Sequence, residues 1–235
     1  MWLAAAALWP GPVRAADWGG MLALTSDYVF RGLSRTDHGA AAQAGLHVRS
    51  TERWFAGVWA SNVASSPNGP GHVELNLNAG RGWDLSDDWS ASAGWVRYLH
   101  PDASNSGRFD WDDLSASLIF TDRFVLTASV APSAPQVYTY GASGRRRTTA
   151  LEVAWREPIA GAWSLVAAAG RYDSSGSGPL GQPYLAWQVG VSAQLDRFEL
   201  ALTHFDVDAA GRRRFGSAAA DDRWVFSLTW RYAAD

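Results

Sequence analysis

The residues whose type and spacing most clearly suggest a chemical role are two opposite charges near the start of the chain, Asp27 and Arg31. They lie four positions apart in an alternating stretch, so we expect both on one face of one strand, about 13 Å apart along it. At that distance they cannot pair, and each needs a partner on a neighbouring strand. Glu74, Asn76 and Asn78 occupy the polar positions of another alternating stretch and are the expected partners. Two interpretations stay open: a charged ring that selects solutes in a pore, or a buried network that holds the strands in register.

Further charged and amide side chains fall on the same polar side of their strands, and we interpret all of them as lining one interior. The expected lining set is Asp27, Arg31, Arg49, Glu74, Asn76, Asn78, Glu152, Arg156, Gln188, Glu199 and Arg231. Both signs of charge occur, so these groups can pair, which lowers the cost of burying them. Small residues between them leave room for either a narrow water-filled channel or an interior closed by an Arg–carboxylate network.

Two arginine triplets lie where turn-forming residues predict long loops. Their members are Arg145, Arg146, Arg147, Arg212, Arg213 and Arg214. Such loops would bind anionic lipopolysaccharide groups or attract anionic solutes, unless they are simply solvated. The acidic residues Asp110, Asp112 and Asp113 are a weak cation candidate, and their spacing is not that of a calcium loop. We therefore predict no metal site.

Signals for catalysis and for cofactors are weak. The chain has 5 His and no Cys, and neither a G-x-S-x-G nor an H-E-x-x-H motif occurs. His204 lies on the apolar side of its strand, where a barrel phospholipase acting on lipid would need its base, so this enzyme stays a lesser alternative. Otherwise we expect neither an enzyme nor a cofactor. The net charge of −3 gives no electrostatic reason to expect nucleic acid.

To share one side, these polar residues must lie on strands that have one polar and one apolar face. The alternation of apolar and polar residues with period two predicts such strands. Val73, Leu75 and Leu77, for example, alternate with polar residues, and successive strand side chains point to opposite sides of a sheet. The pattern predicts twelve strands, at residues 18–32, 40–50, 54–62, 71–83, 89–99, 109–120, 123–131, 147–156, 163–172, 184–195, 198–206 and 222–233. Short turns and mostly longer loops alternate between them.

Every strand that follows a short turn begins with an aromatic residue, as does the first strand. The set is Trp18, Trp54, Trp89, Phe124, Trp163 and Phe198, at intervals of about 35 residues. Aromatic side chains are enriched at membrane edges, so we expect them to form a girdle. The sequence thus predicts an all-β fold, a closed antiparallel transmembrane β-barrel of about 12 strands with short periplasmic turns and longer extracellular loops. A soluble β-sandwich or propeller is the alternative.

The first residues have the character of a targeting signal. Residues 1–15 contain an apolar run from Trp2 to Trp9 and then Val13-Arg14-Ala15, which fits a small-residue cleavage site. The basic residues that usually precede such a run are missing. We expect residues 1–15 to be a secretory signal peptide and residues 16–235 to form the barrel.

Three segments carry a resemblance to a known family: SDYVFRGLS at residues 26–34, FAGVWASNV at residues 55–63 and VELN at residues 73–76. Together they resemble a proteobacterial family labelled TorF-like porins, which is also classed as a conserved family of unknown function. The resemblance implies a secreted barrel in the outer membrane of a Gram-negative bacterium, placed there by the barrel-assembly machinery among lipid and lipopolysaccharide. It brings no catalytic residues. The chain departs from the usual outer-membrane ending because Ala233-Ala234-Asp235 follow the last aromatic residue.

The expected function is a channel for passive diffusion of small solutes or ions. A twelve-stranded barrel is wider than an eight-stranded one, whose interior is nearly filled, and narrower than a sixteen-stranded porin. The alternative from another class is a non-conducting barrel that serves as an anchor or adhesin. The state of the interior, open or filled, discriminates between the two.

Overall fold

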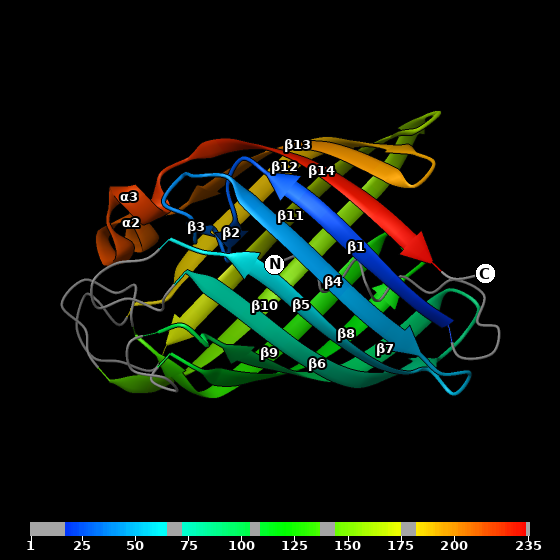
Figure 1. Cartoon of the computed structure of the whole chain (residues 1–235), viewed down its shortest axis with the longest axis horizontal. Helices are drawn as coiled ribbons and strands as arrows, with labels where there is room; N and C mark the ends of the chain where they lie inside the picture. The colour runs from blue at the N-terminus through cyan, green and yellow to red at the C-terminus, as the bar shows by residue number, and fades with distance from the viewer. Residues whose placement is uncertain (1–16, 65–71, 104–108, 137–143, 175–181, 234–235) are drawn as a thin grey trace.

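The chain folds into one closed barrel of twelve antiparallel strands (Figure 1). The computed structural model describes residues 17–64, 72–103, 109–136, 144–174 and 182–233. The barrel strands are β1 (Asp17–Thr25), β4 (Ala41–Arg49), β5 (Trp54–Asn62), β6 (Val73–Asp84), β7 (Trp89–Leu99), β8 (Trp111–Phe120), β9 (Phe124–Pro135), β10 (Arg145–Ala160), β11 (Trp163–Ser174), β12 (Tyr184–Leu195), β13 (Phe198–Val207) and β14 (Arg223–Ala233). Each pairs with its neighbour in the chain, and β1 closes the ring by pairing with β14. The predicted fold class is confirmed.

The two ends of the barrel differ in their connections, and we call them the turn end and the loop end. At the turn end Thr121 and Asp122 have φ angles of 47° and 58°, and the Arg123 N–H donates to the Phe120 carbonyl at 3.0 Å. Positive φ at both central residues is the type I′ turn that suits a tight hairpin. The loop end carries two short helices, α2 (Ala209–Phe215) and α3 (Ser217–Ala220), at the left of Figure 1.

The barrel wall is apolar outside and polar inside. Leu22, Leu46 and Leu151 point outward and are each more than half exposed, whereas Gln43 and Glu74 point inward and are buried. This is the reverse of a soluble protein, and it suits strands that alternate between a lipid-facing and an interior side. Among the described residues, no helix is long and apolar enough to cross a membrane.

Apart from Ile119, the larger buried apolar side chains gather in the loop-end half of the barrel. They form three clusters, whose larger members are Leu33, Tyr172, Tyr184 and Val207 in the first, Tyr98 and Trp111 in the second, and Tyr28 and Val63 in the third. Tyr28 and Leu33 do not belong to the barrel wall. The packed core of this protein therefore lies inside one end of the barrel, around a segment that enters it.

That segment corrects the first predicted strand. The prediction of one strand over residues 18–32 is wrong, because β1 ends at Thr25 and the chain then turns inward as a small hairpin, β2 (Val29–Phe30) and β3 (Leu33–Ser34). Figure 1 shows β2 and β3 within the outline of the barrel, close to the loop end. The expected signal peptide, residues 1–15, lies outside the described residues.

Candidate functional site: the barrel interior

The inward hairpin, residues 26–36, is built on a two-residue turn. Arg31 and Gly32 have φ angles of 53° and 80°, which is again the type I′ geometry that matches the twist of a hairpin. Positive φ is uncommon for a residue other than glycine. The Arg35 N–H donates to the Tyr28 carbonyl at 2.7 Å and extends the pairing of β2 with β3.

This inward hairpin crosses the barrel from one wall to the other. On one side the Tyr28 hydroxyl donates to Glu74 Oε1 of β6 at 2.9 Å. On the other, Gly32 lies so close to β12 that a Cβ atom there would be 2.5 Å from the Ala186 Cβ and 2.6 Å from Val207 Cγ1. β6 and β12 are six positions apart in the ring of twelve strands, which makes them opposite walls. Only glycine combines this backbone conformation with this close approach.

Three ion pairs attach the inward hairpin to three different strands. They are Asp27 with Arg223 of β14 at 3.1 Å, Arg31 with Asp113 of β8 at 2.6 Å, and Arg35 with Glu74 of β6 at 2.7 Å. None of these six side chains is more than 15% exposed. A buried ion pair is costly to break because removing one partner leaves a buried charge uncompensated.

Neutral donors add hydrogen bonds to two of these three buried carboxylates, Asp27 and Glu74. Asp27 Oδ1 accepts hydrogen bonds from the hydroxyls of Ser34 and Thr36, both at 2.7 Å. Glu74 Oε1 accepts from Asn76 Nδ2 at 3.0 Å as well as from Tyr28. Such satisfied networks make the conformation of a buried polar group specific.

The prediction that Asp27 and Arg31 lie on one strand and find partners among Glu74, Asn76 and Asn78 is wrong. The hairpin turn at Gly32 removes both residues from the wall and points them at strands far along the chain. Glu74 instead pairs with Arg35, and the Asn76 amide donates a hydrogen bond to Glu74.

A turn-side cavity of about 200 Å³ lies between the inward hairpin and the turn end. Gln188, Glu199 and Arg231 belong to its lining. Glu199 lies 2.9 Å from the Arg231 guanidinium and 3.9 Å from that of Arg156. These charged side chains are 18% to 33% exposed, so water reaches this half of the interior.

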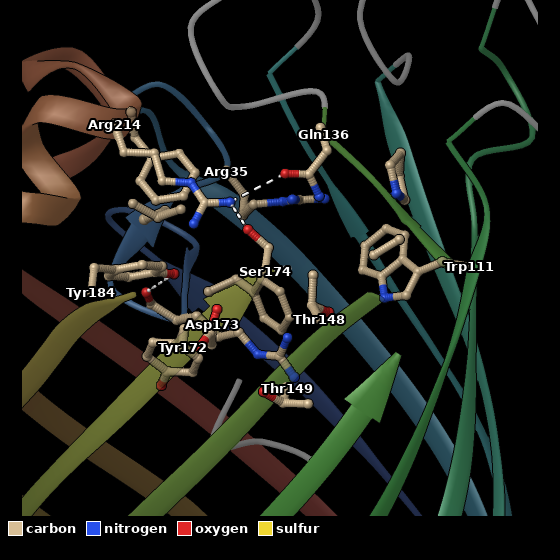
Figure 2. A pocket seen from close by; sticks show the side chains of 16 residues that line it. Arg35, Trp111, Gln136, Thr148, Thr149, Tyr172, Asp173, Ser174, Tyr184 and Arg214 are labelled. Atoms are coloured by element: carbon tan, nitrogen blue, oxygen red, sulfur yellow. Dashed lines mark hydrogen bonds between the residues drawn. The ribbon is translucent and has the colours of Figure 1, made fainter. Parts of the chain in front are cut away.

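A loop-side pocket of about 110 Å³ lies on the other side of the hairpin. Figure 2 shows Arg214 entering it from α2 and donating to Ser174 and to Gln136 Oε1, the latter at 3.2 Å. Tyr184 donates its hydroxyl hydrogen to the Arg31 carbonyl at 3.0 Å, which fixes the hairpin turn as the floor of the pocket. The inward hairpin therefore stands between two cavities.

Three further residues of the expected lining set, Glu152, Arg49 and Asn78, are on wall strands and are partly buried. Glu152 accepts a hydrogen bond from the Tyr172 hydroxyl at 2.7 Å, below the hairpin turn. Arg49 lies at the turn end, where its backbone pairs with Asp17. Asn78 packs against Gly57, whose missing side chain leaves space for the amide.

The six expected girdle residues all lie on the outer surface at the turn end. Trp18, Trp54, Trp89, Phe124, Trp163 and Phe198 are between 42% and 52% exposed. Two of them pack against another aromatic side chain. Trp18 packs against Tyr232 and Trp89 against Phe120, with ring centroids 5.5 and 4.7 Å apart.

The prediction that both arginine triplets lie in loops is wrong. The first, Arg145–Arg147, begins β10, because the ladder with β9 continues up to Pro135. The second is on α2, which starts with the Asp208 side chain accepting from the Gly211 N–H at 2.8 Å. Helical spacing turns Arg214 into the barrel and leaves Arg213 exposed.

The acidic cluster is divided by the strand on which it lies. Adjacent residues of β8 face opposite sides, so Asp113 points inward to Arg31 while Asp112 points outward to Arg97 at 2.7 Å and to the Trp95 indole at 2.9 Å. Asp110 accepts from the His100 N–H at 3.0 Å. Across the described residues no group of three or more His, Cys, Asp or Glu is arranged to hold a metal.

His204, the expected base of an alternative enzyme, lies on the outer face between Trp187 and Trp224. Its Nε2 atom is 3.4 Å from Asp222 Oδ2. Within the part of the chain that the structure describes, no hydroxyl is hydrogen-bonded to this ring.

Comparison with known proteins identifies the family. A family model described as a bacterial protein of unknown function (Gcw_chp) matches residues 12–232. The chain belongs to the Gcw_chp family. This agrees with the predicted resemblance to a family of unknown function. No curated protein matches the chain in sequence.

Solved structures show the same fold as this Gcw_chp protein at very low sequence identity. The NanC porin is 9% identical with a TM-score of 0.56, and the match covers 94% of this chain and 100% of NanC. The KdgM porin is 7% identical with a TM-score of 0.52, covering 93% and 99%. An outer membrane channel of Pseudomonas putida F1, COG4313, is 12% identical with a TM-score of 0.56, covering 96% and 97%. A further KdgM structure, at a TM-score of 0.53, is a complex with disordered oligogalacturonate.

Several residues that organise the interior of this Gcw_chp barrel were not found by sequence reasoning. Arg35 lies in a segment that the sequence predicts to be a loop, Asp113 has acidic neighbours in the sequence, and Arg223 lies at the start of a predicted strand. The one local signal was Gly32, which breaks the alternation of the first strand. Each partner is remote in sequence, so spacing could not reveal it.

Proposed function

We propose that the protein is an outer-membrane channel for passive diffusion of small polar solutes or ions. The observation that carries this proposal is the reversed polarity of the wall, with exposed leucines and aromatics outside and charged groups with cavities inside. Such a barrel is suited to lipid outside and water inside. The shared fold with NanC, KdgM and COG4313 supports it, and the oligogalacturonate held by KdgM makes a polar solute a reasonable class.

In this proposal the loop end faces the cell exterior and the turn end the periplasm. The aromatic girdle then marks the periplasmic edge of the bilayer. Residues 1–15 serve as a secretory signal, and the barrel-assembly machinery inserts the mature chain. The exposed Arg147 and Arg213 lie at the loop end, where they contact anionic lipopolysaccharide groups. No step of this function needs catalysis or a cofactor.

The inward hairpin also favours a second candidate, a non-conducting barrel that serves as an anchor or adhesin. Its three buried ion pairs and its contacts with opposite walls fill the loop-end half. A channel requires solutes to pass beside this hairpin, whereas an anchor does not.

Planar-bilayer recording tests the proposal and separates it from the anchor. The wild-type chain is compared with a variant in which Tyr28–Arg35 is replaced by a short Gly-Ser linker. We expect small conductance steps from the wild type and larger ones from the variant. Silence of the wild type with conductance of the variant would indicate a plugged barrel, and silence of both over a range of salts and voltages would reject the channel.

A further inference from the structure

The turn-side cavity contains two amide side chains whose hydrogen-bonding groups the protein does not use. Gln43 of β4 and Gln188 of β12 both line this cavity. Gln43 is only 5% exposed, yet no hydrogen bond joins either amide to another of the described residues. A buried amide needs a partner, because leaving its donor and acceptor unmet is costly. The partner of the Gln43 amide is therefore a molecule that enters the cavity, either water or a solute.

The wall between these two amides adds further groups that both donate and accept hydrogen bonds. The strands β4, β1, β14, β13 and β12 follow one another around the ring, so Gln43 and Gln188 approach the cavity from two sides. Between them lie Thr203 of β13 and Ser227 and Thr229 of β14. Amides and hydroxyls each combine a donor with an acceptor, as the hydroxyl groups of a solute do. The lining therefore suits a compound with several hydroxyls.

The charged side chains of the turn-side cavity are already paired. Glu199 lies 2.9 Å from the Arg231 guanidinium, and Asp27 lies 3.1 Å from that of Arg223. A charged solute would have to compete with these ion pairs, whereas a neutral solute leaves them intact. The Phe205 ring adds an apolar surface against which the C–H groups of such a solute can pack.

We propose that the turn-side cavity binds a small neutral polyol, and that the Gln43 and Gln188 amides recognise its hydroxyl groups. A cavity of about 150 Å³ holds benzene, which has six non-hydrogen atoms. The turn-side cavity is about 200 Å³, which by the same ratio suits about eight non-hydrogen atoms. A four-carbon polyol such as erythritol has this size. The inference rests on the proposed channel function and names the class of solute that the channel takes.

Saturation-transfer difference NMR of the full chain tests the site with erythritol as the probe, in dodecyldimethylamine oxide, a detergent without sugar groups. The matched analogue is 1,4-butanediol, because it keeps the four-carbon chain and lacks the two inner hydroxyls. We expect erythritol to bind and butanediol to bind about tenfold more weakly or worse, since each lost hydrogen bond costs a factor of about five. Erythronate, the corresponding acid, should bind no more tightly than erythritol.

Two variants test the role of the amides. Gln43→Leu changes the volume little and should fold, because no described residue is hydrogen-bonded to this amide. It should weaken erythritol binding about fivefold or more. Gln188→Leu should have the same effect from the other side of the cavity, and it keeps the test valid if Gln43→Leu does not fold. Gln194→Leu is the matched control, because the Gln194 amide donates to the Asp196 and Phe198 carbonyls at 2.6 and 3.2 Å, and it should leave the affinity unchanged.

Three results would overturn the inference. Erythritol binding that survives both Gln43→Leu and Gln188→Leu would show that the amides do not recognise it. Butanediol that binds as well as erythritol would show that hydroxyl groups are not recognised, and erythronate that binds more tightly would show that Arg231 selects an anion. If none of the three compounds binds, water alone occupies the cavity and the inference is also wrong.

Planar-bilayer recording of the same preparation separates this inference from the channel proposal. If the wild type conducts but does not bind erythritol, the channel stands and the polyol site is wrong. If it binds erythritol and loses this binding in the two amide variants, but passes no current, the site stands as a receptor pocket and the channel is wrong.

Discussion

The two halves of the barrel interior use the same kind of side chain in opposite surroundings. In the loop-end half the partners Arg35 and Glu74 are 4% and 1% exposed. In the turn-end half the partners Arg231 and Glu199 are 33% and 18% exposed. Both pairs join an arginine to a glutamate across 2.7 to 2.9 Å, so the chemistry of the contact does not distinguish them.

The difference is the inward hairpin. It brings Tyr28, Leu33 and their neighbours into one half and turns a polar lumen into a packed core. The other half keeps the larger, turn-side cavity of about 200 Å³, with charged side chains that are partly exposed. One end of the barrel therefore provides most of the specific packing, while the charges of the other end are more accessible and, in the proposed channel, act on solutes. This division predicts that equal substitutions in the two halves have unequal effects.

The largest expected effect comes from Glu74→Gln, which leaves Arg35 charged inside the packed half. Breaking a buried pair costs about 3–5 kcal/mol, so the free energy of unfolding in urea, measured in lipid vesicles, should fall by that amount. Glu157→Gln is the control, because its pair with Arg123 lies on the surface at the turn end. It should cost at most about 1 kcal/mol. Equal losses in the two variants would contradict the division into halves.

Gly32→Ala should have the next largest effect, since it combines two costs. The positive φ of 80° costs about 1–2 kcal/mol for a residue with a Cβ, and the contact with Ala186 at 2.5 Å adds about 1–3 kcal/mol of overpacking. Gly161→Ala isolates the first cost, because Gly161 also has positive φ but no atom within 4 Å of an added Cβ. Thermal unfolding on gels should show a clearly larger shift for Gly32→Ala. Similar shifts would mean that the hairpin does not press against the opposite wall.

The barrel wall can be predicted from the sequence, but only part of the barrel interior can. Alternation predicts the strands of the wall because the side that each residue faces, lipid or interior, decides whether it is apolar or polar. This pattern is local in the sequence. The stretch from Leu24 to Arg31 keeps most of this alternation, with interruptions at Ser26 and Val29, so it predicts a continued strand until Gly32. The ion pairs that hold the hairpin join residues 82 and 196 positions apart for Arg31 and Asp27. Such contacts depend on how the ring closes, and no spacing in one sequence encodes that.

On the turn side, Glu199→Gln should change selectivity more than stability. The pair of Glu199 with Arg231 is partly exposed, so its loss should cost at most about 1 kcal/mol. Removing this negative charge makes the region around Arg231 and the nearby Arg156 more positive, and charged side chains of a lumen set ion preference. The reversal potential in a salt gradient should shift toward anions. An unchanged reversal potential would remove Glu199 from the path of the ions.

The smallest and most discriminating effect should be the change that salt makes to the effects of Glu199→Gln and Glu74→Gln. The Debye length is about 10 Å at 0.1 M and about 3 Å at 1 M, and screening acts only where ions and water enter. The selectivity shift of Glu199→Gln should therefore shrink as salt rises over this range. The stability loss of Glu74→Gln should stay the same, because the hairpin keeps ions away from Arg35. If both effects shrink together, water and ions reach the pair of Glu74 and Arg35, and this pair does not lie in a packed core that excludes them.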